Sequence, residues 1–267
     1  KGKSIWEFGT SQDYKTKADS DFKKRSSEVS SEDQRETTYV FVSPWTWDSS
    51  KKDNKLEDFV DAQKAAHDLS DVIYIDGSKL QTWFENCPAV AAWHARNTMQ
   101  LTPKGGVRCI DEFWADFVGR YDPKLVESVL LAGRKANAES LVEQLMGRPG
   151  PIRLSADSVD EVVAFAIAAI RAAKAEVRLF LESRAIVVET FAAGRDLIAK
   201  DNLIFLLNGE TTKSPGQFYS VAPTLVPLGR HQKSGQSETL SRPTGYDLGK
   251  ALEELGMSEP EARTLAR

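Results

Sequence analysis

The first hundred residues alternate between short apolar runs and longer polar stretches with helical spacing. Short runs rich in β-branched and aromatic residues favour strands, and stretches without Pro or Gly favour helices. We therefore expect helices at Asp13–Val29 and Leu56–Leu69 to separate three strands, at Ser4–Thr10, Thr38–Ser43 and Asp71–Asp76. Strands that alternate with helices form parallel sheets, so this part of the chain is predicted to be α/β.

The same alternation continues beyond a Pro- and Gly-rich stretch at residues 102–106, which reads as a linker. The expected strands are Val126–Ala132, Pro151–Leu154, Ala185–Glu189, Leu203–Leu207 and Thr224–Leu228. The expected helices are Asp111–Arg120, Ala136–Met146, Ser158–Ala173, Ala192–Ala199, Leu248–Leu255 and Ser258–Arg267. We therefore predict a domain at residues 1–101, a parallel-sheet α/β domain at residues 107–240, and the start of a small helical subdomain at residues 241–267.

Composition narrows the class of protein. A hydrophobic content of 41% and a charged content of 28% are those of an ordinary globular protein. The net charge of −4 argues against a generally basic nucleic-acid binder but allows a local basic patch. Two cysteines and three scattered histidines form neither a disulfide framework nor a zinc pattern, which indicates a reducing cytoplasm. No apolar run has the roughly 18 residues of a membrane span, so no membrane association is expected.

Both ends of the chain suggest a longer protein. The opening Lys1-Gly2-Lys3 lacks a starting methionine, and the closing residues 261–267 stop inside a helical pattern. We therefore expect further sequence on either side.

One charged residue interrupts the first apolar strand. Glu7 lies between Trp6 and Phe8, and a carboxylate on a buried strand is unfavourable unless it is paired, bound to a metal or at an edge. Metal-dependent cleavage of a phosphodiester needs such oxygen ligands, and a lysine nearby can polarise the attacking water. Lys15 and Lys17 follow on the next helix. On residue types alone, the alternative is a surface glutamate on an edge strand beside a solvated helix face.

The first domain resembles the Mrr-like branch of the PD-(D/E)xK nuclease superfamily in three segments, Trp6-Glu7-Phe8-Gly9, Tyr39–Pro44 and Val72–Leu80. The resemblance implies a restriction-endonuclease-like three-layer core that binds Mg²⁺, with Glu7 as metal ligand and catalytic residue. The family's lysine stands two residues after the glutamate, where this chain has Gly9. In some relatives this lysine lies on the following helix, which implies Lys17 or Lys15 here. The family's preceding aspartate lies on an upstream strand, so the core is expected to be incomplete at its N-terminus.

The second domain resembles the nucleotide-binding core of STAND and AAA-type NTPases. The resemblance rests on Leu131-Ala-Gly-Arg134 before a helix, on the strand Pro151–Leu154, and on Leu240–Pro243 before the closing helices. It implies a phosphate loop at Ser155–Glu161, where a working loop carries glycines and a lysine. This stretch has neither, and its acidic residues would repel phosphate, so ATP is not expected as a cofactor. We interpret Ser158 as a helix N-cap followed by acidic residues that the helix dipole favours.

Together the resemblances imply a metal-dependent DNA endonuclease effector in a larger bacterial antiphage-defence protein, controlled by a STAND-like module. The implied cofactor is Mg²⁺, and the implied partners are DNA, other subunits of a defence complex and further copies in a full-length oligomer. The alternative is a non-catalytic regulatory or protein-interaction module built on degenerate nuclease and NTPase folds. A basic, metal-binding cleft beside Glu7 would favour the first hypothesis, and a neutral, filled cleft would favour the second.

Overall fold

The computed structural model describes residues 2–50, 55–101, 105–232 and 237–266, and the chain divides into two units, Lys1–Glu85 and Asn86–Arg267. Residues 102–104, the centre of the expected linker, lie outside the described residues. Residues 86–101, which the sequence places in the first domain, pack within the second unit. There the backbone N–H of Ala89 donates to the Ser183 carbonyl at 3.0 Å, and Arg96 binds Glu112.

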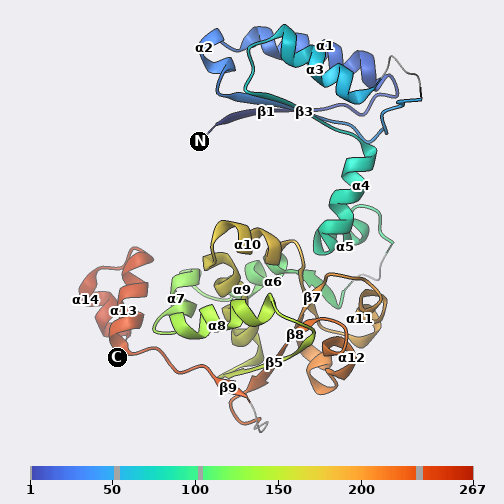
Figure 1. Ribbon diagram of the computed structural model, residues 1–267. Helices are drawn as coiled ribbons and strands as arrows, with labels where there is room; N and C mark the ends of the chain where they lie inside the picture. The colour runs from blue at the N-terminus through green and yellow to red at the C-terminus, as the bar shows by residue number, and fades with distance from the viewer. Residues whose placement is uncertain (1, 51–54, 102–104, 233–236, 267) are drawn as a thin grey trace. The chain divides into compact units, whose positions relative to one another are not determined.

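The first unit is built on a three-stranded parallel sheet in the order β1-β2-β3 (Figure 1). Strand β1 spans Lys3–Phe8, β2 spans Thr37–Val42 and β3 spans Asp71–Ile75. The prediction that these three apolar runs share one sheet is confirmed.

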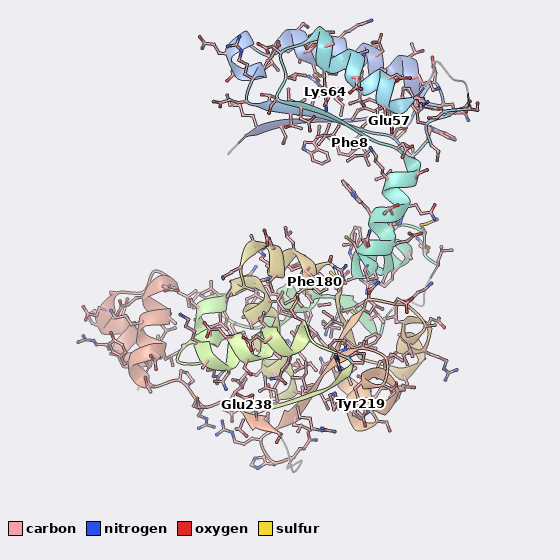
Figure 2. The ribbon with its side chains drawn as sticks, in the orientation of Figure 1. Phe8, Glu57, Lys64, Phe180, Tyr219 and Glu238 are labelled. Carbon is pink, nitrogen blue, oxygen red and sulfur yellow. The ribbon has the colours of Figure 1, made fainter. Side chains whose placement is uncertain are left out.

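Two helices, α1 (Tyr14–Glu28) and α3 (Leu56–Ala66), cover one face of this sheet, and the short α2 (Ser31–Gln34) leads from α1 into β2 (Figure 1). Alternate strand residues turn towards them, and Phe22 of α1 meets Tyr39 edge-on at 4.9 Å between ring centres. Phe8 lies on the opposite face of the sheet (Figure 2), where Trp6 and Ile73 are also exposed. Leu80 packs on part of this opposite face, so in the described part of the unit the third layer expected of the core is not complete.

Helix α4 (Gly77–Asn86) follows β3 and brings Leu80 against the buried Val40, Val42 and Ile75. The Asp76 carboxylate begins this helix by accepting from the backbone N–H of Lys79 at 3.0 Å.

The second unit contains a six-stranded sheet in the order β4-β6-β7-β8-β5-β9. The strands are β4 (Val107–Cys109), β5 (Gly150–Ala156), β6 (Ala185–Val188), β7 (Ile204–Leu207), β8 (Pro223–Gly229) and β9 (Glu238–Thr239). Five strands are parallel, and β4 runs antiparallel to β6, so the sheet is mixed rather than parallel throughout as predicted. Strand β4 is too short at three residues to show an alternating pattern in the sequence.

Both faces of this sheet are covered. The helices of the unit are α5 (Pro88–Asn97), α6 (Ile110–Val118), α7 (Glu127–Leu131), α8 (Lys135–Leu145), α9 (Val159–Ala172), α10 (Ala175–Glu182), α11 (Phe191–Ile198) and α12 (Gly216–Tyr219), with a 3-10 turn at Gly209–Lys213 and a closing pair, α13 (Gly245–Glu254) and α14 (Glu259–Leu265). Helix α9 lies in the main core, where every side chain from Val162 to Ile170 is at most 2% exposed.

The strand predicted at Val126–Ala132 is wrong, because this segment forms α7. Its apolar residues include Leu130, which is buried in the core around α9. A short apolar run gives the same signal whether it is a buried strand or a single turn of buried helix, so periodicity could not separate the two.

Candidate functional site

Glu7 lies on the side of β1 that faces α1, with 19% of its side chain exposed. Arg25 of α1 donates from Nε to Glu7 Oε1, and its Nη1 contacts Glu28 Oε2 at 2.8 Å. The hydrogen bonds to Glu28 and to Glu7 raise the pKa of Arg25 above its usual value. Glu7 is thus a paired carboxylate on an edge strand, and its pairing with Arg25 accounts for its partial burial.

The two candidate lysines have other partners. Lys17 Nζ lies 2.6 Å from Asp21 Oδ1, one helical turn along α1. Lys15 Nζ donates to the Asp48 carbonyl at 3.1 Å and lies 4.7 Å from the centre of the Trp47 ring. Across the described part of the chain, no hydrogen bond or ion pair joins either lysine to Glu7.

Position 9 has little room for the lysine that the nuclease resemblance implies two residues after Glu7. Gly9 is buried, and a Cβ atom at this position would overlap the Phe41 ring of β2. A lysine two residues after Glu7 would therefore collide with the Phe41 side chain unless that ring moved. Any cation acting beside Glu7 has to come from another element, and α1 supplies one in Arg25.

Helix α1 presents a charged strip towards Glu7. Lys17, Asp21 and Arg25 are spaced four residues apart, which places them on one helix face. Sequence reasoning named Lys17 but missed Asp21 and the role of Arg25. The four-residue spacing was the signal that could have found them.

Among the described residues, the buried polar atoms without a hydrogen-bond partner include one in this strip and one on the sheet face that α1 covers. These two are Asp21 Oδ2 and the Tyr39 hydroxyl, in residues that are 9% and 2% exposed. Burial raises the pKa of Tyr39 above its usual range, and the charges of Glu7 and Asp21 raise it further. The Tyr39 ring therefore lies within electrostatic reach of both carboxylates.

The loop after β2 carries two tryptophans that could in principle stack on nucleic-acid bases. Trp47 is 5% exposed and packs against Tyr74 and Phe59, each at 5.0 Å between ring centres. Trp45 is 39% exposed, and its indole N–H donates to the Thr10 carbonyl at 3.0 Å. Trp47 is therefore a packing residue, while Trp45 tethers the loop to the end of β1.

In the second unit, the loop after β5 lies where a parallel α/β sheet usually receives a ligand, at the carboxyl ends of its strands. Here its acidic residues are already paired. Asp157 contacts Arg230 at 2.6 Å and Arg242 at 3.0 Å, and Glu161 contacts the buried Arg134 at 2.9 Å. Hydrogen bonding from Arg242 lowers the pKa of Asp157.

The Ser158 hydroxyl accepts from the backbone N–H of Glu161 at 3.1 Å, which confirms the interpretation of Ser158 as a helix N-cap.

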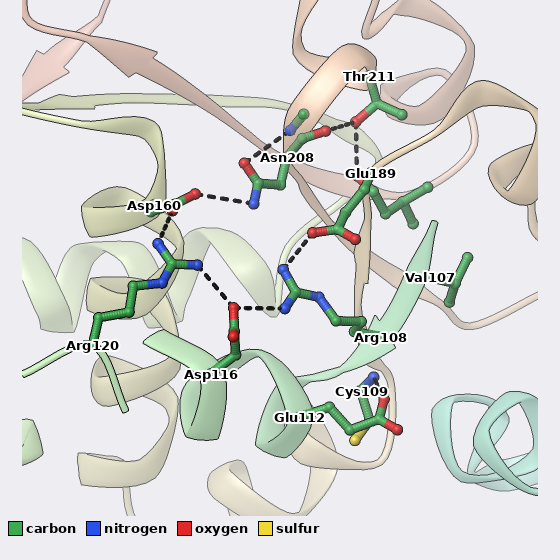
Figure 3. A network of polar contacts seen from close by, with 12 residues as sticks. Val107, Arg108, Cys109, Glu112, Asp116, Arg120, Asp160, Glu189, Asn208 and Thr211 are labelled. Atoms are coloured by element: carbon green, nitrogen blue, oxygen red, sulfur yellow. Dashed lines mark hydrogen bonds and ion pairs between the residues drawn. The ribbon is translucent and has the colours of Figure 1, made fainter. Parts of the chain in front are cut away.

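A chain of ion pairs continues from this loop across the same edge of the sheet. Asp160 accepts from Arg120 at 2.6 Å and from Asn208 at 3.2 Å, while Asp116 accepts from Arg120 at 2.8 Å and from Arg108 at 3.2 Å. Figure 3 shows the resulting series, which runs Glu189, Arg108, Asp116, Arg120, Asp160 and Asn208. Acidic and basic side chains alternate along it, so the edge is close to neutral. Sequence reasoning did not find this network, because its members come from five separate segments.

Neither a metal-holding cluster nor a membrane-spanning helix is found among the residues that the structure describes. No group of three or more His, Cys, Asp or Glu side chains there is arranged to hold a metal ion. No described helix has both the length and the apolar character needed to cross a membrane.

The chain matches no protein-family model, no curated protein and no solved structure.

Proposed function

We propose that the first unit is the endonuclease region of a larger cytoplasmic antiphage-defence protein and that it uses Mg²⁺ bound at Glu7 to cleave DNA. The observation that carries the proposal is the ion pair of Glu7 with Arg25, on a face of α1 that also carries the Lys17–Asp21 pair. Carboxylates interleaved with cations suit a site that receives both a metal ion and a phosphate.

The residues present fit Mg²⁺ in chemical type. Mg²⁺ keeps several waters and is held by one or two carboxylates together with substrate phosphate, so it needs no cage of three acidic side chains. Glu7 and the uncommitted oxygen of Asp21 are anionic oxygen donors of this kind. When bound, the ion would neutralise charge on the scissile phosphate and lower the pKa of a bound water.

The chain's own cations have separate roles in this proposal. Arg25 orients Glu7 through its guanidinium, and its planar group also suits a phosphate. Lys17 holds one oxygen of Asp21 and carries the positive charge that the family's lysine supplies. Lys15 is the competing candidate, but its contact with the Asp48 carbonyl and the Trp47 ring directs it elsewhere.

For the second unit we propose a STAND-like control module that works without ATP. The STAND-like part rests on the sequence resemblance, and two observations support the absence of an ATP requirement: the phosphate-loop position carries Asp157 rather than glycine and lysine, and Arg230 and Arg242 already neutralise that carboxylate. Such a module would act through other subunits of a defence complex or through further copies of the full-length protein.

The test is plasmid cleavage by the natural full-length protein, with Mg²⁺ and with EDTA. Glu7→Gln is expected to abolish cleavage, because glutamine keeps the shape of the side chain and removes the anionic ligand. Glu57→Gln, at an exposed position of α3 (Figure 2), is the matched control and should cleave as the wild type does. Lys17→Ala should also impair cleavage, and Lys15→Ala should have the smaller effect.

Thermal melting of each variant separates a chemical loss from an unfolded protein. Undiminished, metal-dependent cleavage by well-folded Glu7→Gln protein would remove Glu7 from the site. No cleavage by the wild type under any activating condition would favour the second candidate function, a non-catalytic regulatory or interaction module. The pairing of Glu7 with Arg25 and of Asp157 with two arginines is the observation that supports that candidate.

A further inference from the structure

An open pocket of about 1090 Å³ lies within the second unit, between α5, α10 and the start of α6. Val90 and Trp93 of α5 and Leu179 of α10 line it, and they are 47%, 42% and 66% exposed. The backbone hydrogen bond from Ala89 to Ser183, at 3.0 Å, ties the start of α5 to the end of α10. Single exposed apolar residues are ordinary, but a group of them around a hollow indicates a binding surface.

The size and shape of this pocket favour a segment of protein over a small molecule. Small-molecule sites measure about 300–1,000 Å³ and enclose most of their ligand. This pocket lies above that range, and its large apolar side chains are exposed rather than enclosed. Val90 and Trp93 are three residues apart and so share one face of α5. A hollow walled by two helices with such a face suits the apolar side of a third helix.

The charged residues of the pocket are mainly acidic. Four carboxylates and two guanidinium groups line it, in Asp111, Glu112, Glu127, Glu182, Arg171 and Arg178. Arg171 serves two of the carboxylates, with Asp111 at 2.5 Å and Glu127 at 2.8 Å. Its side chain is 17% exposed and lies 5.0 Å from the Trp114 ring, whereas that of Asp111 is 78% exposed. One inward-directed cation therefore leaves negative charge in surplus on the solvent side.

The ion pair of Glu112 with Arg96 has the same orientation. The carboxylate is 33% exposed and the arginine 11%, because Arg96 also donates to the Val107 carbonyl. Negative charge thus surrounds an apolar centre, and the complementary partner carries positive charge around an apolar stripe. A second copy docked symmetrically through this patch would set like charges against one another, so the charge pattern disfavours it.

We propose that this pocket is the docking site for a basic amphipathic helix of a partner protein. The apolar residues of that helix pack on Val90, Trp93 and Leu179, and its lysines or arginines meet Asp111 and Glu127. The inference goes beyond the proposed function, because a docking site on the second unit requires neither cleavage nor Mg²⁺.

The experiment measures peptide binding by the 267-residue chain. The probe is a fluorescein-labelled helical peptide of about 15 residues with leucines every three or four residues and lysines on its other face. A second peptide has glutamate in place of each lysine, and a third has the lysines and leucines of the first in scrambled order. Fluorescence anisotropy at physiological salt is expected to show binding of the first peptide and at least tenfold weaker binding of the other two.

Leu179→Gln tests the apolar part of the pocket. It removes an exposed apolar contact and should weaken binding of the basic peptide at least fivefold. Leu265→Gln is the matched control, because Leu265 of α14 is 63% exposed and lies outside the pocket. It should change binding less than twofold.

Asp111→Lys tests the charged part. It should weaken binding of the basic peptide and strengthen binding of the acidic one, an exchange that damage to the fold does not produce. Glu139→Lys is its matched control at an exposed position of α8 outside the pocket, and it should change both affinities less than twofold. Thermal melting checks each variant, and should Asp111→Lys fail to fold, the three peptides together with Leu179→Gln decide.

Three results would overturn the inference. They are no binding of the basic peptide, equal binding of the scrambled peptide, which would show attraction by net charge alone, and a dimer in sedimentation velocity that Leu179→Gln dissolves, which would assign the pocket to a second copy. Each of them leaves the proposed nuclease intact, and failed DNA cleavage likewise leaves the docking site intact.

Discussion

Arg134 is a cation with only 5% of its surface exposed, and its partners span the second unit. Its guanidinium donates to the Ser241 carbonyl at 2.7 Å and pairs with Glu161 at 2.9 Å. The residue before it, Gly133, has a φ of +67°, and a Cβ there would lie 2.8 Å from Asp247 Oδ2. One short turn therefore joins the start of α8 to α9 and to the approach of α13.

Replacing this cation should destabilise the second unit. Arg134→Met is expected to lower the free energy of unfolding by about 3–5 kcal/mol, because it leaves the Glu161 carboxylate without its partner. For a unit of this size that corresponds to roughly 6–20 °C in Tm. Differential scanning calorimetry measures the effect.

The matched control is Arg263→Met, which removes an exposed arginine paired with Glu259 across one helical turn. Exposed pairs of this kind contribute little, so its unfolding free energy should stay within about 0.5 kcal/mol of the wild type. Equal effects of the two substitutions would show that burial of Arg134 is not what makes it important.

Among the elements, the loop between β5 and α9 departs furthest from a nucleotide-binding site. We expect no Mg-ATP binding in the low micromolar range by calorimetry, because Asp157 occupies the position where phosphate needs hydrogen-bond donors. Asp157→Ser should release Arg230 and Arg242 and so increase the affinity for inorganic triphosphate relative to the wild type. Tight ATP binding by the wild type, or no gain by the variant, would contradict this view of the loop.

The elements of this chain differ in how clearly their residues predict them. The strands of the first unit were predictable because residues such as Tyr39 to Val42 are β-branched or aromatic and are bounded by polar residues. Helix α7 and strand β4 were not, since five and three residues are too few to show a period.

The sites were harder to predict than the strands. Glu7 was evident as a charge inside an apolar run, whereas Asp21 was hidden in a helix where nearly every residue is polar. The arginines of the second unit could not be assigned to partners, because their contacts reach across as many as 107 residues of sequence.

At the scale of the whole molecule, carboxylates paired with cations set the response to acid. Hydrogen bonds from Lys23 and Lys64 lower the pKa of Asp19 and of Asp71 from 3.8, and those from Arg120 and Arg242 do the same for Asp116 and Asp157. A carboxylate whose pKa is lowered in the folded state stabilises the fold at pH values above its unfolded-state pKa. It loses that contribution as the pH falls through its folded-state pKa.

We therefore expect Tm to change little between about pH 7 and pH 5 and to fall below about pH 4. Circular dichroism melts at constant ionic strength measure this, with melts in added salt as the control for screening of the exposed pairs. A loss of Tm already between about pH 7 and pH 6 would point to histidines instead and contradict the assignment.

Helix α9 carries a consequence for how this protein could change over evolutionary time. Its residues 162–170 are enclosed on every side, so packing fixes where these turns of the helix lie. Asp157, in the loop before the helix, is exposed and contacts only loop arginines among the ion pairs of the described residues, so it can be exchanged without moving the sheet behind it. A lineage could gain or lose a ligand at this edge through a few substitutions at such positions, while its descendants keep the same architecture.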